Sequence, residues 1–127
     1  MKCKDKVEGA FESRMEDIRT LWKAEDNKTE DLGSLDEYGL GFDYISAGTF
    51  SDQKAPYWRW QLSYGGPTEE FRMYENGDME FWYLDWFDGA CVDVGGDDYD
   101  IIDNMWGEYK EYYKELDKEF TDALRLK

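Results

Sequence analysis

The first long pattern of apolar positions runs through residues 4–24 of the chain. Apolar side chains recur there at intervals of three and four residues, at Val7, Ala10, Phe11, Met15, Ile18, Leu21 and Trp22. This spacing places them on one side of an α-helix and leaves Glu8, Glu12, Glu16 and Lys23 on the polar side. We therefore expect an amphipathic helix that packs against the rest of the protein.

The pattern changes in residues 25–41, which are rich in turn residues. Three glycines, Gly33, Gly39 and Gly41, accompany the acids Glu25, Asp26, Glu30, Asp31, Asp36 and Glu37, and Lys28 is the only base. We call this segment the connector, and we expect a loop with one helical turn around Leu35.

Two segments then alternate between apolar and polar residues, as β-strands do when one face is buried. The sheet is expected to begin in residues 42–50, and residues 51–56 read as a loop. In residues 57–64, one face carries Trp58, Trp60, Leu62 and Tyr64, and the other carries Tyr57, Arg59, Gln61 and Ser63. Gly65-Gly66-Pro67 then turns the chain.

Asn76-Gly77 is a strong β-hairpin signal between the strand-like residues 70–75 and 79–87. A two-residue turn there pairs Glu75 with Asp78 and Phe71 with Trp82. This register puts Phe71, Met73, Trp82, Leu84 and Trp86 on the core face. It puts Arg72, Tyr74, Phe81, Tyr83 and Asp85 on the opposite, open face.

A short fifth strand is expected at residues 90–94, followed by Gly95-Gly96 and a last helix. That helix carries Ile102, Met105, Trp106, Tyr109, Tyr113, Leu116, Phe120 and Leu124 at helical spacing, and Asp97 or Asp98 can cap its start. The whole pattern predicts one α+β domain over residues 1–127. It has an antiparallel meander of about five strands, with an N-terminal and a C-terminal helix packed on one face.

Charge adds a further feature, because the chain carries a formal net charge of −16. Residues 73–109 contain eleven acids and no Lys or Arg. Large aromatics are interleaved with these acids, whereas disordered acidic tails lack such residues. The carboxylates should therefore be displayed from a folded frame. They repel nucleic acid and anionic membranes and attract cationic surfaces, although a merely solvated, salt-adapted surface is the simpler alternative.

The residue types that are missing exclude much of enzymology. The chain has no His, so the usual general base, the Ser-His and Cys-His nucleophile pairs and nearly all zinc sites are absent. Its two cysteines, Cys3 and Cys91, do not form a disulfide framework, and a buried free thiol is expected at Cys91. With no signal-peptide pattern and no membrane-spanning run, we expect a reduced, cytoplasmic location in a host cell.

Other binding chemistries fit the sequence poorly. The acids of residues 93–103 lack the spacing of a calcium loop, which leaves only adventitious binding of a hard cation. The Gly-Gly turns lack the lysine and the spacing of a phosphate-binding loop, and we expect no cofactor. Asp85 and Asp88 with Trp82 and Trp86 suggest a carbohydrate-active enzyme with paired carboxylates as one alternative.

Rows of carboxylates can instead imitate a nucleic-acid backbone. Duplex DNA presents one phosphate per about 3.4 Å of axis on each strand, alternate strand residues lie about 6.6–6.8 Å apart, and helix neighbours lie about 5–6 Å apart. The sequence therefore predicts a protein that binds a basic surface and does not itself bind nucleic acid. The predicted partner-binding residues are Asp85, Asp88, Asp93, Asp97, Asp98, Asp100, Asp103, Glu75, Asp78, Glu80, Tyr74, Phe81 and Tyr83. The six acids of the connector form a second predicted patch.

Two stretches carry a family resemblance. Gln61-Leu62-Ser63-Tyr64-Gly65-Gly66-Pro67, followed by Glu70-Phe71-Arg72, and later Asp85-Trp86-Phe87-Asp88-Gly89-Ala90, resemble small acidic proteins of phages, plasmids and other mobile elements. Such proteins are often counter-defence factors, among them anti-restriction and anti-CRISPR proteins that act as nucleic-acid mimics. The resemblance covers residues 38–109 and implies a class of activity without catalytic residues.

Together, the charge pattern and the resemblance predict a non-enzymatic inhibitor of a host defence nuclease or CRISPR effector. An alternative is an immunity protein that neutralises a basic nuclease toxin. Both would block a basic site on another protein, so charge alone does not separate them.

Overall fold

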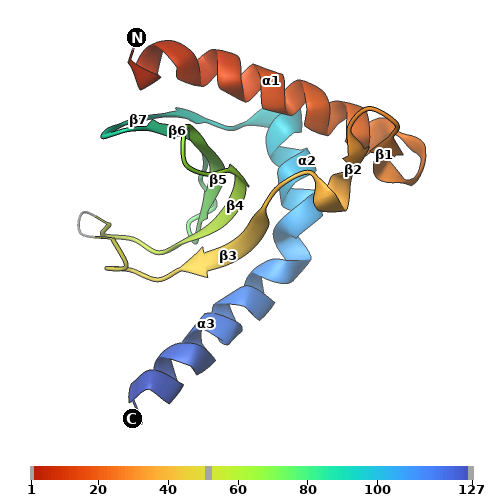
Figure 1. The fold of residues 1–127 in the computed structure, drawn as a ribbon. Coiled ribbons are helices and arrows are strands. Elements are labelled where there is room, and N and C mark those ends of the chain that lie inside the picture. Colours follow the sequence, from red (N-terminus) through yellow and green to blue (C-terminus); the bar gives the residue numbers. More distant parts are fainter. Residues whose placement is uncertain (1, 51–52, 126–127) are drawn as a thin grey trace.

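The computed structural model describes residues 2–50 and 53–125 and shows a five-stranded sheet with helices on its N-terminal and C-terminal sides in the chain (Figure 1). Helix α1 (Cys3–Lys23) comes first. The sheet contains β3 (Gly41–Ile45), β4 (Tyr57–Ser63), β5 (Thr68–Tyr74), β6 (Met79–Asp85) and β7 (Asp88–Asp93), all antiparallel and in chain order. The predicted α+β meander and the predicted first helix are confirmed.

The connector folds into a small unit of its own. A two-stranded ribbon of β1 (Lys28–Thr29) and β2 (Gly33–Ser34) lies between two 3-10 turns, η1 (Glu25–Asn27) and η2 (Leu35–Glu37). The predicted helical turn around Leu35 is confirmed, and this side chain anchors the unit because it is buried in the core.

The C-terminal segment differs from its prediction in two respects. It is not one helix but α2 (Gly96–Trp106), a 3-10 turn η3 (Gly107–Tyr109) and α3 (Lys110–Arg125). The break falls at Gly107, a residue of low helix propensity. The expected capping by Asp97 or Asp98 is wrong, because Gly95 is the N-cap and no side chain caps the helix. Both acids lie in the first turn, where they still favour the helix dipole.

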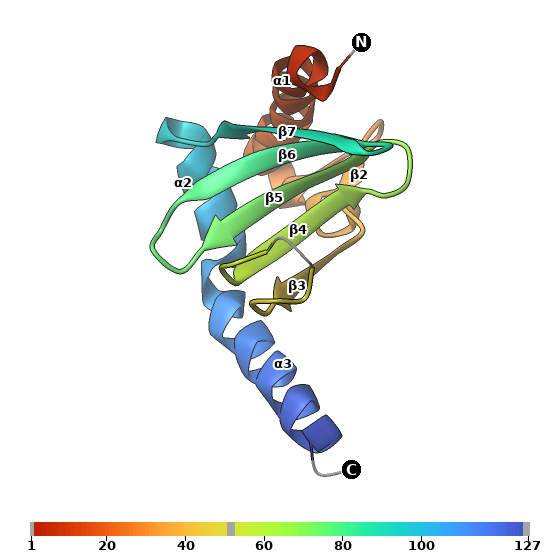
Figure 2. The same ribbon diagram turned by 90° about the vertical axis from the view of Figure 1, so that its left-hand side faces the viewer.

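The sheet is strongly curved, and both α1 and α2 lie along its convex side (Figure 1). Phe11 of α1 packs against Phe71 and Phe81, with ring centroids 6.4 and 5.5 Å apart. Trp106 of α2 stacks on Phe42 at 4.3 Å. The prediction that both helical segments cover one face is therefore confirmed. Among the described residues no helix lies over the concave face, and the described parts of the β3–β4 loop lie in front of it (Figure 2).

The register of the β5–β6 hairpin differs from the predicted one by one residue. Phe71 pairs with Phe81 rather than with Trp82, and Met73 pairs with Met79. The turn contains three residues, since the Tyr74 and Asp78 backbones are hydrogen-bonded and Gly77 has a φ of 97°. This is the three-residue loop in which a glycine in the left-handed region closes the turn.

That shift moves every side chain of β6 to the other face. The predicted burial of Trp82, Leu84 and Trp86 on the core face is wrong. The buried residues are Met79, Phe81 and Tyr83, at 3%, 0% and 9% exposure. Trp82 and Leu84 lie half-buried on the concave side, and Trp86 lies in the turn beyond the strand.

A close approach at Gly39 gives a stability prediction. A Cβ added there would collide with the indole nitrogen of Trp60, which is buried, and would lie 3.0 Å from the Gln61 carbonyl oxygen. Gly39→Ala should therefore destabilise the protein by about 1–3 kcal/mol, the range for overpacking. Gly41→Ala is the control, because nothing lies within 4 Å of its Cβ position. Equal denaturation midpoints for the two variants would contradict this packing.

Candidate functional site

The predicted acids divide into groups, and the largest group gathers around the β5–β6 turn. Glu75, Asp78, Glu80 and Asp93 line one open depression of about 380 Å³. Asp100 and Asp103 of α2 lie close to the same turn, because Tyr99, which precedes Asp100, donates a hydrogen bond to the Gly77 carbonyl at 2.7 Å. We call the set the hairpin acidic cluster: Glu75, Asp78, Glu80, Asp93, Asp100 and Asp103.

Two tyrosine hydroxyls fix carboxylates of this cluster. Tyr74 donates to Glu80 at 2.6 Å, and Tyr44 donates to Glu75 at 2.8 Å. Burial raises the pKa of both tyrosines, and the carboxylate that each one contacts raises it further. The Tyr44 hydroxyl and Lys114 in turn lower the pKa of Glu75. The carboxylates are therefore held in place by donors that stay protonated at neutral pH.

Only two ion pairs reduce the charge of the cluster within the described part of the chain. Lys114 lies 3.1 Å from Glu75, and Lys110 lies 3.4 Å from Asp103. Asp78, Asp93 and Asp100 are exposed and form no ion pair among the described residues. Nor do any three metal-ligating side chains of residues 2–50 and 53–125 approach closely enough to hold an ion. The carboxylates form a spread surface of negative charge.

The other predicted acids lie elsewhere. Asp85 and Asp88 sit at the opposite end of β6 and β7, where Asp88 accepts a hydrogen bond from the Cys3 backbone at 2.9 Å. Asp97 and Asp98 lie beside α1, and Arg19 binds Asp98 through two hydrogen bonds of 2.7 and 2.8 Å. Asp88 and Asp98 thus help to hold α1 in place, and the base-free window is not one continuous array.

The six acids of the connector form a separate exposed group, and the structure describes no ion pair for any of them. Glu25, Asp26 and Glu30 line a shallow depression with Lys28. The connector lies near the end of β4, because the Leu40 amide donates to Gln61. The β5–β6 turn is at the other end of the sheet (Figure 2). The molecule therefore has two acidic regions at opposite ends.

The three predicted aromatic anchors do not all reach the surface. Tyr74 lies on the open, concave face of the sheet, as predicted, and its side chain is half-buried. The placement of Phe81 and Tyr83 on the open face is wrong, because the register shift turns both into the core. Neither side chain is available as a contact.

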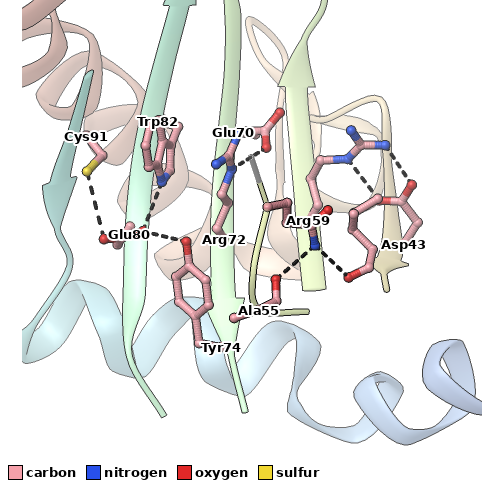
Figure 3. Close-up of polar contacts among 11 residues, drawn as sticks. Asp43, Ala55, Arg59, Glu70, Arg72, Tyr74, Glu80, Trp82 and Cys91 are labelled. Atoms are coloured by element: carbon pink, nitrogen blue, oxygen red, sulfur yellow. Dashed lines mark hydrogen bonds and ion pairs between the residues drawn. The ribbon is translucent and has the colours of Figure 1, made fainter. Parts of the chain in front are cut away.

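A network of charged and aromatic side chains on the concave face escaped the sequence analysis. Glu70 is 2% exposed, and its carboxylate accepts a hydrogen bond of 2.8 Å from Arg72 (Figure 3). The Arg72 guanidinium also lies 4.2 Å from the Trp82 ring and 4.8 Å from the Tyr57 ring. Alternate strand residues share a face, so the pair Glu70 and Arg72 was the available signal.

Three aromatic side chains project from the β4–β5 and β6–β7 turns, which lie at the end of the sheet opposite the β5–β6 turn. Tyr64, Trp86 and Phe87 are 78%, 90% and 104% exposed, although Tyr64 was expected on the core face of its strand. Trp86 has a φ of 56°, a conformation that is rare for a bulky residue. The two turns are those of the family resemblance, and they meet because Thr68 pairs with Leu84. For the β6–β7 turn, the sequence feature that could have indicated it is the pair Asp85 and Asp88, which flank the turn.

The expected burial of the Cys91 thiol is wrong. Cys3 is 3% exposed in the core, whereas Cys91 is an exposed residue of β7 on the concave face. Desolvation raises the pKa of both thiols. At Cys91 the neighbouring Glu80 and Asp93 raise it further, and the thiol contacts Glu80 at 3.8 Å.

The reactivity of the Cys91 thiol should therefore depend on the negative electrostatic potential of the hairpin acidic cluster. In the folded protein, iodoacetamide at neutral pH should alkylate Cys91 and spare Cys3, because only the thiolate reacts and Cys3 is buried. Asp93→Asn should raise the Cys91 rate several-fold by lowering its pKa. Peptide mass spectrometry measures both rates. An unchanged rate of Cys91 alkylation in Asp93→Asn would show that the acids of the cluster do not raise the pKa of this thiol.

The groups considered for carbohydrate chemistry do not converge. Trp82 lies on the concave face, while Asp88 contacts the start of α1 on the convex face. In the described residues no helix combines the length and apolarity needed to cross a bilayer. What the fold and the surface define is an acidic α+β domain with two separated carboxylate regions. Comparison of the chain with known protein families, curated proteins and solved structures gave no match.

Proposed function

We propose that this protein is a non-enzymatic inhibitor that binds the basic nucleic-acid-binding surface of a host defence nuclease or CRISPR effector. Its carboxylates would occupy the positions of phosphates. The observation that carries the proposal is the hairpin acidic cluster, in which six carboxylates on β6, β7, α2 and the β5–β6 turn form ion pairs with only two lysines among the described residues.

The spacing within this cluster suits a basic groove. Glu80 and Asp93 are direct cross-strand partners, and such partners lie about 4.5–5.5 Å apart. Asp100 and Asp103 are neighbours on one helix face at about 5–6 Å. These separations approximate the density of phosphates along a nucleic-acid strand.

Rigid presentation of the carboxylates supports the same proposal. Tyr74 and Tyr44 hold two of them, and the Tyr99 hydrogen bond ties α2 to the β5–β6 turn. Little conformational entropy is then lost on binding. Long-range attraction by the net charge of −16 would steer association with a basic partner, up to about 10⁸–10⁹ M⁻¹s⁻¹.

An immunity protein against a basic nuclease toxin would use the same surface. The two functions differ in their biological effect. We would express the protein in strains that each carry one restriction or CRISPR system, together with isogenic strains lacking that system, and measure phage plating. Plating restored to the level of the deletion strain in at least one host is expected. Protection from a co-expressed basic nuclease toxin, with unchanged plating in every host, would favour the immunity function instead.

A further inference from the structure

Helix α3 carries a stripe of apolar side chains that the protein does not cover. Tyr109, the last residue of η3, and Tyr112, Leu116, Phe120 and Leu124 of α3 recur at intervals of three and four, and their exposed fractions are 51%, 62%, 47%, 65% and 55%. The stripe of α1 has the same spacing, but Met15, Ile18 and Leu21 in it are completely buried. The sequence pattern of α3 is therefore that of a helix that packs against a partner. Within one copy of the chain, the described residues do not cover this stripe.

In the described part of the chain, the contacts that attach α3 to the body of the protein lie mainly in its first half. The Trp58 indole donates to the Lys110 carbonyl at 2.8 Å, and Tyr113 packs edge-on against Phe42. Beyond these contacts the helix projects away from the sheet (Figures 1 and 2). Leu116 and Phe120 line an open groove of about 580 Å³ beside the edge strand β3. A helical end of this length is marginally stable in water without packing.

The charge of α3 is close to neutral, whereas the molecule as a whole is strongly acidic. Of the chain's 15 bases and 31 acids, α3 holds four and five, so its net charge is −1 and that of the remainder is −15. A basic partner would be attracted to the remainder rather than to this helix. Helix α1 is also close to neutral, with five bases and five acids, but its apolar stripe is buried in the core. A second copy of the chain would therefore find low charge together with an exposed apolar stripe at α3.

We propose that α3 is the interface of a symmetric homodimer, in which the stripes of two copies pack antiparallel against each other. This proposal does not depend on the proposed function. The helix is about 24 Å long at 1.5 Å per residue, and the antiparallel order puts the two acidic bodies at opposite ends. They are then separated by more than the Debye length of about 8–10 Å. A parallel order would place them side by side.

The area of the stripe is sufficient for such an interface. Five side chains, each about half exposed and each offering about 200 Å² when fully exposed, present about 500 Å² per copy. This is near the upper limit for an apolar patch on a monomer. Two copies would together bury about 1,000 Å², the lower bound for a specific interface.

Sedimentation equilibrium of the purified full chain tests the proposal. At micromolar to millimolar concentrations the protein should show twice the 15.1 kDa mass of one chain. Leu116→Glu with Phe120→Glu should give a monomer. The control, Tyr64→Glu with Phe87→Glu, changes two apolar residues that are even more exposed, at the far end of the sheet, and should remain dimeric. Circular dichroism would confirm that both variants are folded.

Salt dependence provides a second readout. Dimerisation should strengthen as salt rises, since apolar contacts persist while repulsion between the acidic bodies is screened. The proposal is overturned by a monomeric wild-type protein throughout this range, by a dimer that survives the double change in α3, or by dimerisation that weakens with salt.

Discussion

Reversing three exposed charges of the hairpin acidic cluster should weaken binding to the basic partner by at least about a hundredfold. The variant is Asp78→Lys with Asp93→Lys and Asp100→Lys. Each change places a lysine where the partner presents Lys or Arg, and like charges at an interface cost several kcal/mol. A tenfold loss corresponds to about 1.4 kcal/mol. The binding constant for the defence protein identified by the plating assay is the quantity to measure.

A matched control separates this surface from bulk charge. Glu8→Lys with Glu16→Lys and Glu115→Lys changes the net charge equally, at exposed helix positions that form no ion pair among the described residues. It should weaken binding far less. Equal losses in the two triple variants would mean that only the overall charge matters and that the assignment of the cluster is wrong.

Arg72→Ala is expected to have the largest effect on stability, a loss of about 3–5 kcal/mol in the free energy of unfolding. The change leaves the Glu70 carboxylate, which is 2% exposed, without its cation. Adding Glu70→Gln should recover part of the loss, because it removes the buried charge. Urea denaturation monitored by tryptophan fluorescence gives the values.

Arg59→Ala is the comparison for that experiment. Arg59 also pairs with an acid on the concave face, at 2.7 Å from Asp43, but the Asp43 side chain is 46% exposed. Water can replace the lost cation there, so the cost should be no more than about 1 kcal/mol. If Arg72→Ala costs as little as Arg59→Ala, then burial of Glu70 is not what makes its ion pair matter.

The periodicity of the sequence predicted most of the elements, because buried faces impose the periods of helices and strands. It did not predict the register of the β5–β6 hairpin. Asn76-Gly77 suits both a two-residue turn and the three-residue turn that is present. Strand β6 is apolar at both parities, with Phe81 and Tyr83 alternating with Trp82 and Leu84. The hydrophobic pattern therefore could not choose between the two faces.

The candidate site was predictable in composition but not in arrangement. The sequence shows eleven acids in one window, yet Arg19 pairs with Asp98 across 79 positions of the chain. Such pairing depends on which faces of α1 and α2 meet in the folded protein, and the local sequence pattern of either helix does not show this. Glu80 is a second example, because the observed register turns the side of β6 that carries Glu80 and Trp82 to the concave face, beside its cross-strand partner Asp93.

The central claim is that the carboxylates occupy a nucleic-acid site, and competition tests it most directly. Fluorescent DNA or RNA bound to the identified defence protein should be displaced on titration with this protein, at the concentrations that inhibit activity. The apparent affinity should fall steeply as salt rises. Full inhibition of the enzyme while the nucleic acid stays bound would contradict the claim and would indicate an inhibitor that acts away from the nucleic-acid site.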